Sequence, residues 1–294
     1  RDSLPGGGVR IGALVRNADL AHDPTFARRF PAVAEALLSG ASAQLRNAAT
    51  VGGNLLQRTR CPYFYDIASA CNKREPGAGC EARGGDTRLH AVLGWSESCI
   101  ATNPSDFCVP LVALDAVVEI EGKPGRREVP LESFHRLPAE APERESLLEP
   151  GELIVAMRLP AAAAAFSAHA RYLKVRERTS YAFAVVSAAV ALRIEAARIV
   201  EARLALGGVA LKPWRARAAE EMLAGARPDR TAFRRASEAA LADAKPSGDN
   251  AFKIELGRRI VTRALTLAAA GTPARLPALP ASPFAPVHGA LLHA

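Results

Sequence analysis

The stretch from residue 50 to residue 106 constrains this chain most, because it joins a double-glycine turn to a long segment with little to bury. It opens with Thr50-Val51-Gly52-Gly53-Asn54 and closes with Asn103-Pro104-Ser105-Asp106. Residues 58–99 between them are rich in Pro and Gly, and their apolar residues show little of the regular spacing of a helix or strand. A loop of this length and composition packs no core of its own. Something other than hydrophobic burial must order it.

Four cysteines in this loop are the candidates for that ordering: Cys61, Cys71, Cys80 and Cys99. Thiols clustered in one part of a long chain favour a metal or cluster site over a disulfide scaffold. An iron-sulfur cluster is the favoured interpretation, because each bond from iron to sulfur would anchor a different part of the loop. The spacing lacks the Cys-x-x-Cys knuckles of zinc ribbons. A zinc ion on the same four cysteines, and free or disulfide-linked thiols, remain alternatives.

Two other residues, His90 within the loop and Cys108 after it, are expected to have structural roles. Cys108 lies in the apolar stretch from residue 106 to residue 114, which predicts a packed helix in which a free cysteine acts as a small hydrophobe. His90 could replace one cysteine as a ligand, but a surface or hydrogen-bonding histidine is favoured.

The double glycine suggests an anion-binding turn. Gly52 and Gly53 lack a Cβ, so the backbone can approach a ligand closely, and their N–H groups can point together at phosphate oxygens. A plain tight turn is the alternative, and the dipeptide alone does not decide between them.

Composition excludes several classes of protein. The net charge is +8, but the basic residues are scattered and only 5% of residues are aromatic, so stacking platforms for nucleic acid are missing. A basic surface that docks an acidic partner subunit is favoured. No apolar run approaches the ~18 residues of a membrane span. The chain starts at Arg1 without an apolar signal segment, which suggests a processed or incomplete polypeptide.

The pattern along the chain predicts an α+β protein of two domains. Strands are expected at 9–15, 117–121, 126–130 and 152–160, and the alanine run 161–165 is interpreted as a linker. The second half is predicted as a three-stranded antiparallel sheet followed by helices. Its strands are expected at 172–178, 186–194 and 199–209, and its helices at 213–224, 229–244 and 249–270.

These residues also carry a family likeness. The order of Thr50-Val51-Gly52-Gly53-Asn54, Pro104-Ser105-Asp106, Glu152-Leu153-Ile154 and Lys174-Val175-Arg176-Glu177-Arg178 resembles the FAD-binding medium subunit of molybdenum hydroxylases, the xanthine dehydrogenase and aldehyde oxidoreductase family. The cysteine segment looks like the bacterial periplasmic aldehyde oxidoreductase subgroup, whose flavin subunit also holds a [4Fe-4S] cluster.

The resemblance implies a domain plan. A PCMH-type FAD-binding domain would cover residues 1–160, with the iron-sulfur insertion at about 58–100. A domain like the carbon monoxide dehydrogenase flavoprotein C-terminal fold would cover 168–271, and 272–294 would be a Pro-rich tail. The family's fold begins with a strand and a glycine-containing loop ahead of Arg1, so the FAD-binding domain is expected to be N-terminally incomplete.

The resemblance also implies roles for individual residues. The FAD pyrophosphate and ribityl chain would be lined by Leu45, Ala49, Thr50, Gly52, Gly53 and Asn54. Asp106 would hydrogen-bond the cofactor, Ile154 would touch its adenine or ring system, and Lys174 would lie near the flavin ring. A solvated strand lysine is the alternative for Lys174. Cys61, Cys71, Cys80 and Cys99 would bind the [4Fe-4S] cluster.

As a whole, the chain is expected to be an electron-transfer subunit. The resemblance implies a large molybdopterin subunit that oxidises an aldehyde, a small subunit with [2Fe-2S] clusters, and an external electron acceptor. No catalytic residue is expected in this chain. The alternatives are an NAD-linked flavin subunit like that of xanthine dehydrogenase, or a zinc-stapled assembly module without a redox centre. Either the bacterial periplasm, reached with an exported partner, or the cytoplasm is expected as its location.

Overall fold

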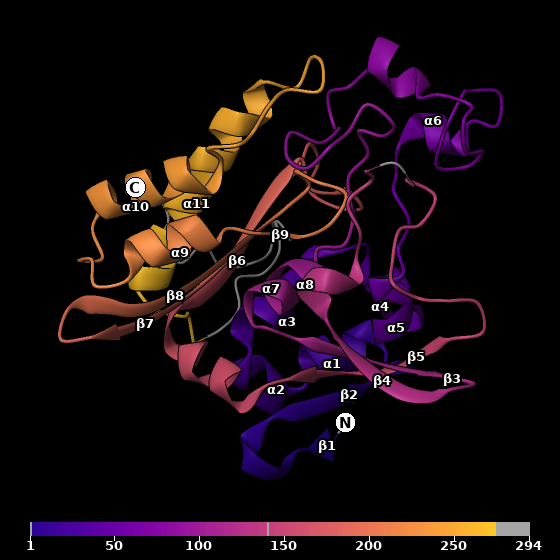
Figure 1. Cartoon of the computed structure of the whole chain (residues 1–294). Helices are drawn as coiled ribbons and strands as arrows, with labels where there is room; N and C mark the ends of the chain where they lie inside the picture. The colour runs from indigo at the N-terminus through magenta and orange to yellow at the C-terminus, as the bar shows by residue number, and fades with distance from the viewer. Residues whose placement is uncertain (1, 140, 275–294) are drawn as a thin grey trace.

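The computed structural model describes residues 2–139 and 141–274. Two antiparallel sheets, each with its own helices, form the α+β structure that the sequence predicts (Figure 1). Most of the tail predicted over 272–294 lies outside the described residues. In the part of the chain that is described, no helix has the length and apolar character needed to cross a membrane.

The first half is built on a five-stranded sheet in the order β1-β2-β5-β3-β4. All four strands predicted for this half are present, and a short edge strand precedes them. The strands are β1 (Asp2–Ser3), β2 (Val9–Gly12), β3 (Val117–Gly122), β4 (Gly125–Pro130) and β5 (Leu153–Leu159). β5 pairs with both β2 and β3, so the two ends of this half meet in the middle of the sheet.

Short helices and a buried apolar core cover this sheet. The helices are α1 (Asn17–His22), α2 (Pro24–Arg29), α3 (Pro31–Ser39), α4 (Ala43–Ala48), α5 (Val51–Leu55), α7 (Cys108–Ala113) and α8 (Leu131–Phe134), with the 3-10 helix η1 (Pro5–Gly7). Phe26, Phe30 and Phe107 are fully buried among them. Cys108 is 0% exposed inside the same core, which confirms its prediction as a packed helix residue.

The second half holds a four-stranded sheet in the order β6-β7-β8-β9. Its elements are β6 (Ala170–Val175), β7 (Val186–Glu195), β8 (Arg198–Gly207), β9 (Trp214–Arg215), α9 (Arg217–Leu223), α10 (Arg230–Ala240) and α11 (Phe252–Ala269). The prediction of three strands for this sheet was wrong, because β9 adds a fourth. Trp214 and Arg215 pair with the edge of β8, so the helix expected from Pro213 begins only at Arg217.

The second sheet lies between the helices of its own half and the core of the first half (Figure 1). Side chains of β7 alternate between these faces, as the period of a strand requires. Ala188, Val190 and Leu192 face the core that includes α9, α10 and α11, while Ala189 and Ala191 join the core of the first half. The alanine run expected to be a linker is the 3-10 helix η3 (Ala161–His169), which joins β5 to β6.

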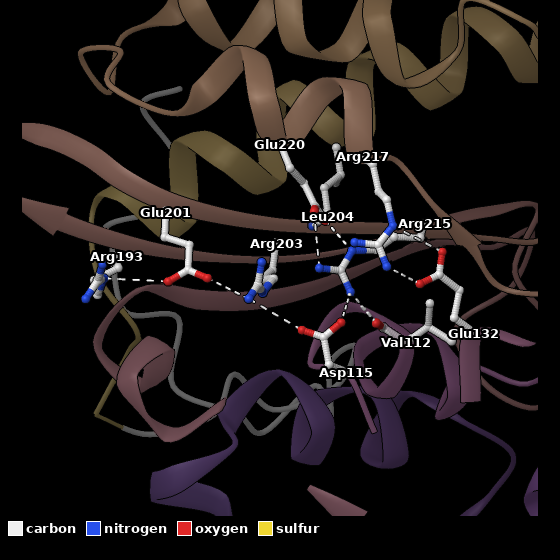
Figure 2. A network of polar contacts seen from close by, with 10 residues as sticks. All are labelled: Val112, Asp115, Glu132, Arg193, Glu201, Arg203, Leu204, Arg215, Arg217 and Glu220. Atoms are coloured by element: carbon white, nitrogen blue, oxygen red, sulfur yellow. Dashed lines mark hydrogen bonds and ion pairs between the residues drawn. The ribbon is translucent and has the colours of Figure 1, made fainter. Parts of the chain in front are cut away.

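Figure 2 shows polar contacts that join the two halves at β8, β9 and α9. Arg215 donates to the carbonyl of Val112 and to Asp115, and its guanidinium also pairs with Glu220. Arg203 pairs with Asp115, and Arg217 pairs with Glu132. Because Val112, Asp115 and Glu132 belong to the first half, this network holds the two halves in a fixed relation.

Residues 58–99 form the long loop that the sequence predicts, seen beyond the two sheets in Figure 1. Only α6 (Pro62–Tyr65) and the 3-10 helix η2 (Glu81–Gly84) interrupt it. An antiparallel bridge between Cys71 and Cys80 brings two of the four cysteines side by side.

Candidate functional site

A cavity of about 1060 Å³ opens where the two halves meet. Its walls come from α3 to α5, from residues 102–107, and from residues 177–185 between β6 and β7. Six residues predicted to bind FAD line it: Leu45, Ala49, Thr50, Gly53, Asn54 and Asp106. These positions are spread over the first half of the chain, and the fold gathers them around one space.

The double-glycine turn is the start of α5, which Thr50 caps by accepting a hydrogen bond from the Gly53 N–H at 3.2 Å. The N–H of Gly52 donates to the carbonyl of Ala13 at 2.7 Å, and the N–H of Asn54 donates to the carbonyl of Thr50. The expectation that these N–H groups point together at a ligand was therefore wrong, because the Thr50 cap and the carbonyls of Ala13 and Thr50 already accept from them.

The two glycines have different steric roles. Gly53 lies on the cavity wall, and a Cβ built there would come within 3.2 Å of the Thr50 hydroxyl. Gly52 is buried on the opposite side, where a Cβ would lie 2.9 Å from that of Ala13. Gly53 thus keeps the wall open, whereas Gly52 lets α5 pack on β2 and is not among the residues lining the cavity.

Asp106, on the cavity wall, is held by two side chains of the second half. Its Oδ1 accepts a hydrogen bond from the Tyr172 hydroxyl at 2.5 Å, and its Oδ2 accepts one from the Lys174 ammonium at 2.7 Å. Lys174 also donates to the carbonyl of Ser39 at 3.1 Å. Burial, together with the Asp106 carboxylate, raises the pKa of Tyr172 well above its ordinary value, so its hydroxyl stays a donor.

Lys174 and Ile154 lie off the cavity wall. The Lys174 side chain is 3% exposed and reaches the cavity through Asp106, so the alternative of a solvated lysine was wrong. Ile154 lies on β5 and packs against the core of the first half. Its contact with FAD stays a prediction.

The four loop cysteines line one small cavity next to the large one. All five cysteines of the chain are free thiols, so the disulfide alternative does not describe this structure. In the described part of the chain, no three or more His, Cys, Asp or Glu side chains form a group that could hold a metal ion. The four cysteines therefore share a cavity as free thiols, without a preformed coordination site.

Charged and amide side chains order the loop around this cavity. Arg74 donates to the carbonyls of Tyr63 and Phe64 at 3.1 and 2.9 Å, and also to that of Ser69. Asn72 bridges the loop by donating to the carbonyl of Ser98 and accepting from the N–H of Gly79. These contacts give the loop a defined shape, although it has almost no regular secondary structure.

Burial favours the neutral thiol form of Cys61 and Cys99. It raises the pKa of Cys61 to about 11, with smaller effects from neighbouring groups including Cys99 and Cys71. Burial also raises the pKa of Cys99, although the nearby Lys73 ammonium acts in the opposite direction. Lys73 is itself 2% exposed and donates to the carbonyl of Pro142 at 2.6 Å. A cation that bound here would have to displace these protons.

Cys61 and Thr59 line both cavities. His90, which also lines the large cavity, lies with its Nε2 3.2 Å from the Cys61 sulfur and is 3% exposed. The prediction of a hydrogen-bonding histidine is confirmed, and a surface position is excluded. The small cavity lined by the four loop cysteines, called the sulfur cavity below, therefore shares a wall with the large cavity.

Other lining residues were not predicted. Arg46 lies on the cavity wall and anchors its guanidinium on the carbonyl of Gly40 at 2.7 Å. Ser105 and Gln57 both donate to the Asn54 side-chain oxygen, at 2.8 and 2.6 Å. Ser105 lies inside a quoted motif and Arg46 follows Leu45 directly, so both could have been found from the sequence. Tyr181 and Phe183 come from the second half and carried no signal.

Comparison with known proteins places this geometry in a family. The sequence model described as "FAD binding domain in molybdopterin dehydrogenase" matches residues 3–162. The chain belongs to this family. The model of the CO dehydrogenase flavoprotein C-terminal domain matches residues 171–268 of the same FAD-binding chain. This chain is thus a flavoprotein subunit of the molybdenum hydroxylases and an oxidoreductase.

Individual relatives agree with this membership. The FAD-binding chain is 48% identical to the aldehyde oxidoreductase FAD-binding subunit PaoB of Escherichia coli K12, over 90% of this chain and 79% of that one. It is similar in structure to carbon monoxide dehydrogenase from Hydrogenophaga pseudoflava, with 28% identity, a TM-score of 0.65, and coverage of 92% of this chain and 76% of that one. Quinoline 2-oxidoreductase from Pseudomonas putida 86, at 24% identity and a TM-score of 0.65, shares the fold over 91% of this chain and 77% of that one.

Proposed function

We propose that this chain is the electron-transfer subunit of a molybdenum-dependent aldehyde oxidoreductase, and that it carries both FAD and a [4Fe-4S] cluster. The reaction class follows the 48% identity to the E. coli aldehyde oxidoreductase subunit. The single observation that carries the electron-transfer role is that Cys61 lines both the sulfur cavity and the large cavity. Two redox groups bound there would be neighbours.

The large cavity has the shape and chemistry for FAD. Its size, the open wall at Gly53 and the polar side chains of Thr50 and Asn54 fit an extended ligand with a polar midsection. The Arg46 guanidinium on the wall fits a pyrophosphate charge. Bound FAD supplies the ability to accept and release electrons singly or in pairs. In this proposal, the chain's own residues orient the cofactor, and Asp106 remains fixed by Tyr172 and Lys174.

The sulfur cavity provides a donor set that suits iron. Cys61, Cys71, Cys80 and Cys99 together line it, and four thiolates are the usual ligands of a [4Fe-4S] cluster. Loading requires each thiol to lose its proton, and the Lys73 ammonium on the cavity wall favours the thiolate of Cys99. Arg74 and Asn72 would hold the loop backbone in place as the cluster binds.

The proposal includes partners. A large molybdopterin subunit would oxidise the aldehyde, a small subunit with [2Fe-2S] clusters would pass on the electrons, and an external acceptor would take them from FAD. The relatives named as carbon monoxide dehydrogenase and aldehyde oxidoreductase support such an assembly. The complex would work in the bacterial periplasm, exported with a partner, or in the cytoplasm.

Purification of the complex tests the proposal. We expect flavin bands and a broad iron-sulfur shoulder in the visible spectrum, with about one FAD in this subunit and iron and acid-labile sulfide beyond the partner's [2Fe-2S] clusters. FAD without the extra iron would refute the proposal of a [4Fe-4S] cluster. Stoichiometric zinc would support the alternative of a zinc-stapled assembly module without a redox centre. Aldehyde-dependent reduction of NAD⁺ would favour the alternative of an NAD-linked subunit, for which a 25% identical putative xanthine dehydrogenase FAD-binding subunit of E. coli is the relevant relative.

A further inference from the structure

His90 lies at the wall between the two cavities, and its backbone is held in place from both sides. Its N–H donates to the carbonyl of Thr87 at 2.9 Å. Its carbonyl accepts from the Lys253 ammonium at 2.7 Å and from the Asn250 amide at 3.1 Å. Lys253 is 0% exposed and also donates to the carbonyls of Leu89 and Gly208. The imidazole therefore projects from a backbone position that is hydrogen-bonded on both sides, within an otherwise irregular loop.

The contacts of the imidazole determine which nitrogen carries its proton. Nε2 lies 3.2 Å from the sulfur of Cys61, and Nδ1 is buried with no hydrogen-bond partner among the described residues. A cysteine that ligates iron is a thiolate, so its sulfur can only accept a hydrogen bond. The proton must then lie on Nε2. Nδ1 stays an unprotonated acceptor, which avoids burying a donor without a partner.

We propose that His90 is a positioning residue that sets the reduction potential of the cluster by donating its Nε2–H to the Cys61 sulfur. The inference rests on the proposed function. Each added electron makes the cluster and its ligands more negative, so a donor aimed at a ligand sulfur stabilises the reduced state and raises the potential. Such outer contacts commonly tune a metal site.

The choice of Cys61 matters for the direction of electron flow. Of the four loop cysteines, Cys61 alone lines the large cavity as well, and His90 lines that cavity beside it. A donor at this sulfur acts on the ligand nearest the FAD site. His90 thus adjusts the potential difference between the two redox groups.

Redox titration of the purified complex tests the role of His90. His90→Phe keeps a planar ring but removes the donor, and His90→Gln keeps an amide donor. We expect the cluster potential of the Phe variant to fall, shifting the equilibrium for electron exchange with FAD by about tenfold, or about 59 mV for a one-electron centre. His90→Gln should recover at least half of this shift. His169→Gln is the matched control, because His169 bonds the carbonyl of Ala268 and lines neither cavity.

A second measurement needs no variant. In complex labelled with ¹⁵N at histidine, pulsed electron paramagnetic resonance of the reduced cluster should detect a coupled histidine nitrogen. Its absence would overturn the proposal, as would an unchanged cluster potential in an iron-replete His90→Phe variant. If that variant loses its iron, the labelled wild-type complex decides the outcome. Wild-type complex with no iron beyond the [2Fe-2S] clusters would instead refute the proposed function, and this inference with it.

Discussion

Lys174 donates a hydrogen bond from its ammonium to Oδ2 of Asp106 over 2.7 Å, and this bond crosses from one half of the chain to the other. The side chains are 3% and 7% exposed, so water screens the pair little. Asp106 lines the large cavity, while Lys174 belongs to β6. The wall of the cavity is therefore fixed by an ion pair whose second member lies outside the FAD-binding domain.

Replacement of Lys174 tests this relationship. Lys174→Met leaves the buried Asp106 carboxylate without its cation, which typically costs about 3–5 kcal/mol of unfolding free energy. We expect a loss of that order in urea unfolding, together with reduced FAD content. Glu255→Gln is the control, because the exposed Arg259–Glu255 pair should contribute no more than about 1 kcal/mol. Equal stabilities for both variants would contradict the role of Lys174.

Gly53→Val should evict FAD. The valine side chain would extend from a wall position next to the Thr50 hydroxyl into the space proposed for the cofactor. The flavin absorbance of the purified variant measures the effect, and we expect at least a tenfold loss. Gly84→Val is the control, since Gly84 also belongs to a short helix, η2, and a Cβ there meets nothing within 4 Å. Normal flavin content in the Gly53 variant would remove that residue from the proposed site.

Cys71→Ser should abolish the extra iron and loosen the loop 58–99, because one anchor of the cluster is lost. Iron analysis and limited proteolysis measure these two effects. Cys108→Ala is the matched control: Cys108 is 0% exposed in the core of the first half, so its loss should cost about 1 kcal/mol of stability and no iron. Equal iron in both variants would argue against the ligand assignment.

Arg215→Met should destabilise the junction between the two halves by about 3–5 kcal/mol in urea unfolding. Its side chain is 1% exposed, and Glu220 would lose its cation while the carbonyl of Val112 would lose a donor (Figure 2). Arg193 in the same network is 45% exposed, so Arg193→Met should cost less than about 1 kcal/mol. A cost for Arg215→Met as small as that for Arg193→Met would show that Arg215 does not stabilise the junction between the halves.

Glu152 should contribute to the loss of stability in acid. Hydrogen bonds from Arg127 at 2.7 and 2.6 Å, and from the N–H of Glu149, lower the pKa of Glu152 to about 2. Because the folded pKa lies below the unfolded value of about 4.3, this contribution is complete above that value and is lost as the pH falls toward 2. Thermal unfolding between pH 5 and pH 2 should therefore vary less steeply in Glu152→Gln than in the wild type. Parallel curves would exclude this contribution.

Much of the fold was predictable because its signals are local. A continuous apolar run marks β5, alternating apolar residues mark β7, and Gly122 with Gly125 marks the β3–β4 hairpin. β9 was missed because Pro213 resembles a helix start. Pairing of Trp214 and Arg215 with β8, together with the ion pairs of Arg215, outweighs that local preference.

The residues of the candidate site could be predicted where they belong to a local sequence motif. Thr50, Gly53 and Asn54 form one such motif, and the four cysteines stand in one loop. The engagement of the Gly52 N–H with Ala13 depends on how β2 packs, and no local pattern reveals it. The contact between His90 and Cys61 likewise arises from loop folding across 29 positions. Tertiary contacts of this kind have no signature in a single sequence.

Because residues 177–185 form part of the wall of the large cavity, retention of FAD should depend on the contact between the two halves of the chain. A polypeptide severed after residue 162 would keep the glycine turn and every loop cysteine, yet it would lack this wall and the cation that steadies Asp106. Substitutions that weaken the contact between the two halves, even far from the cavity, should therefore release FAD before they unfold the protein.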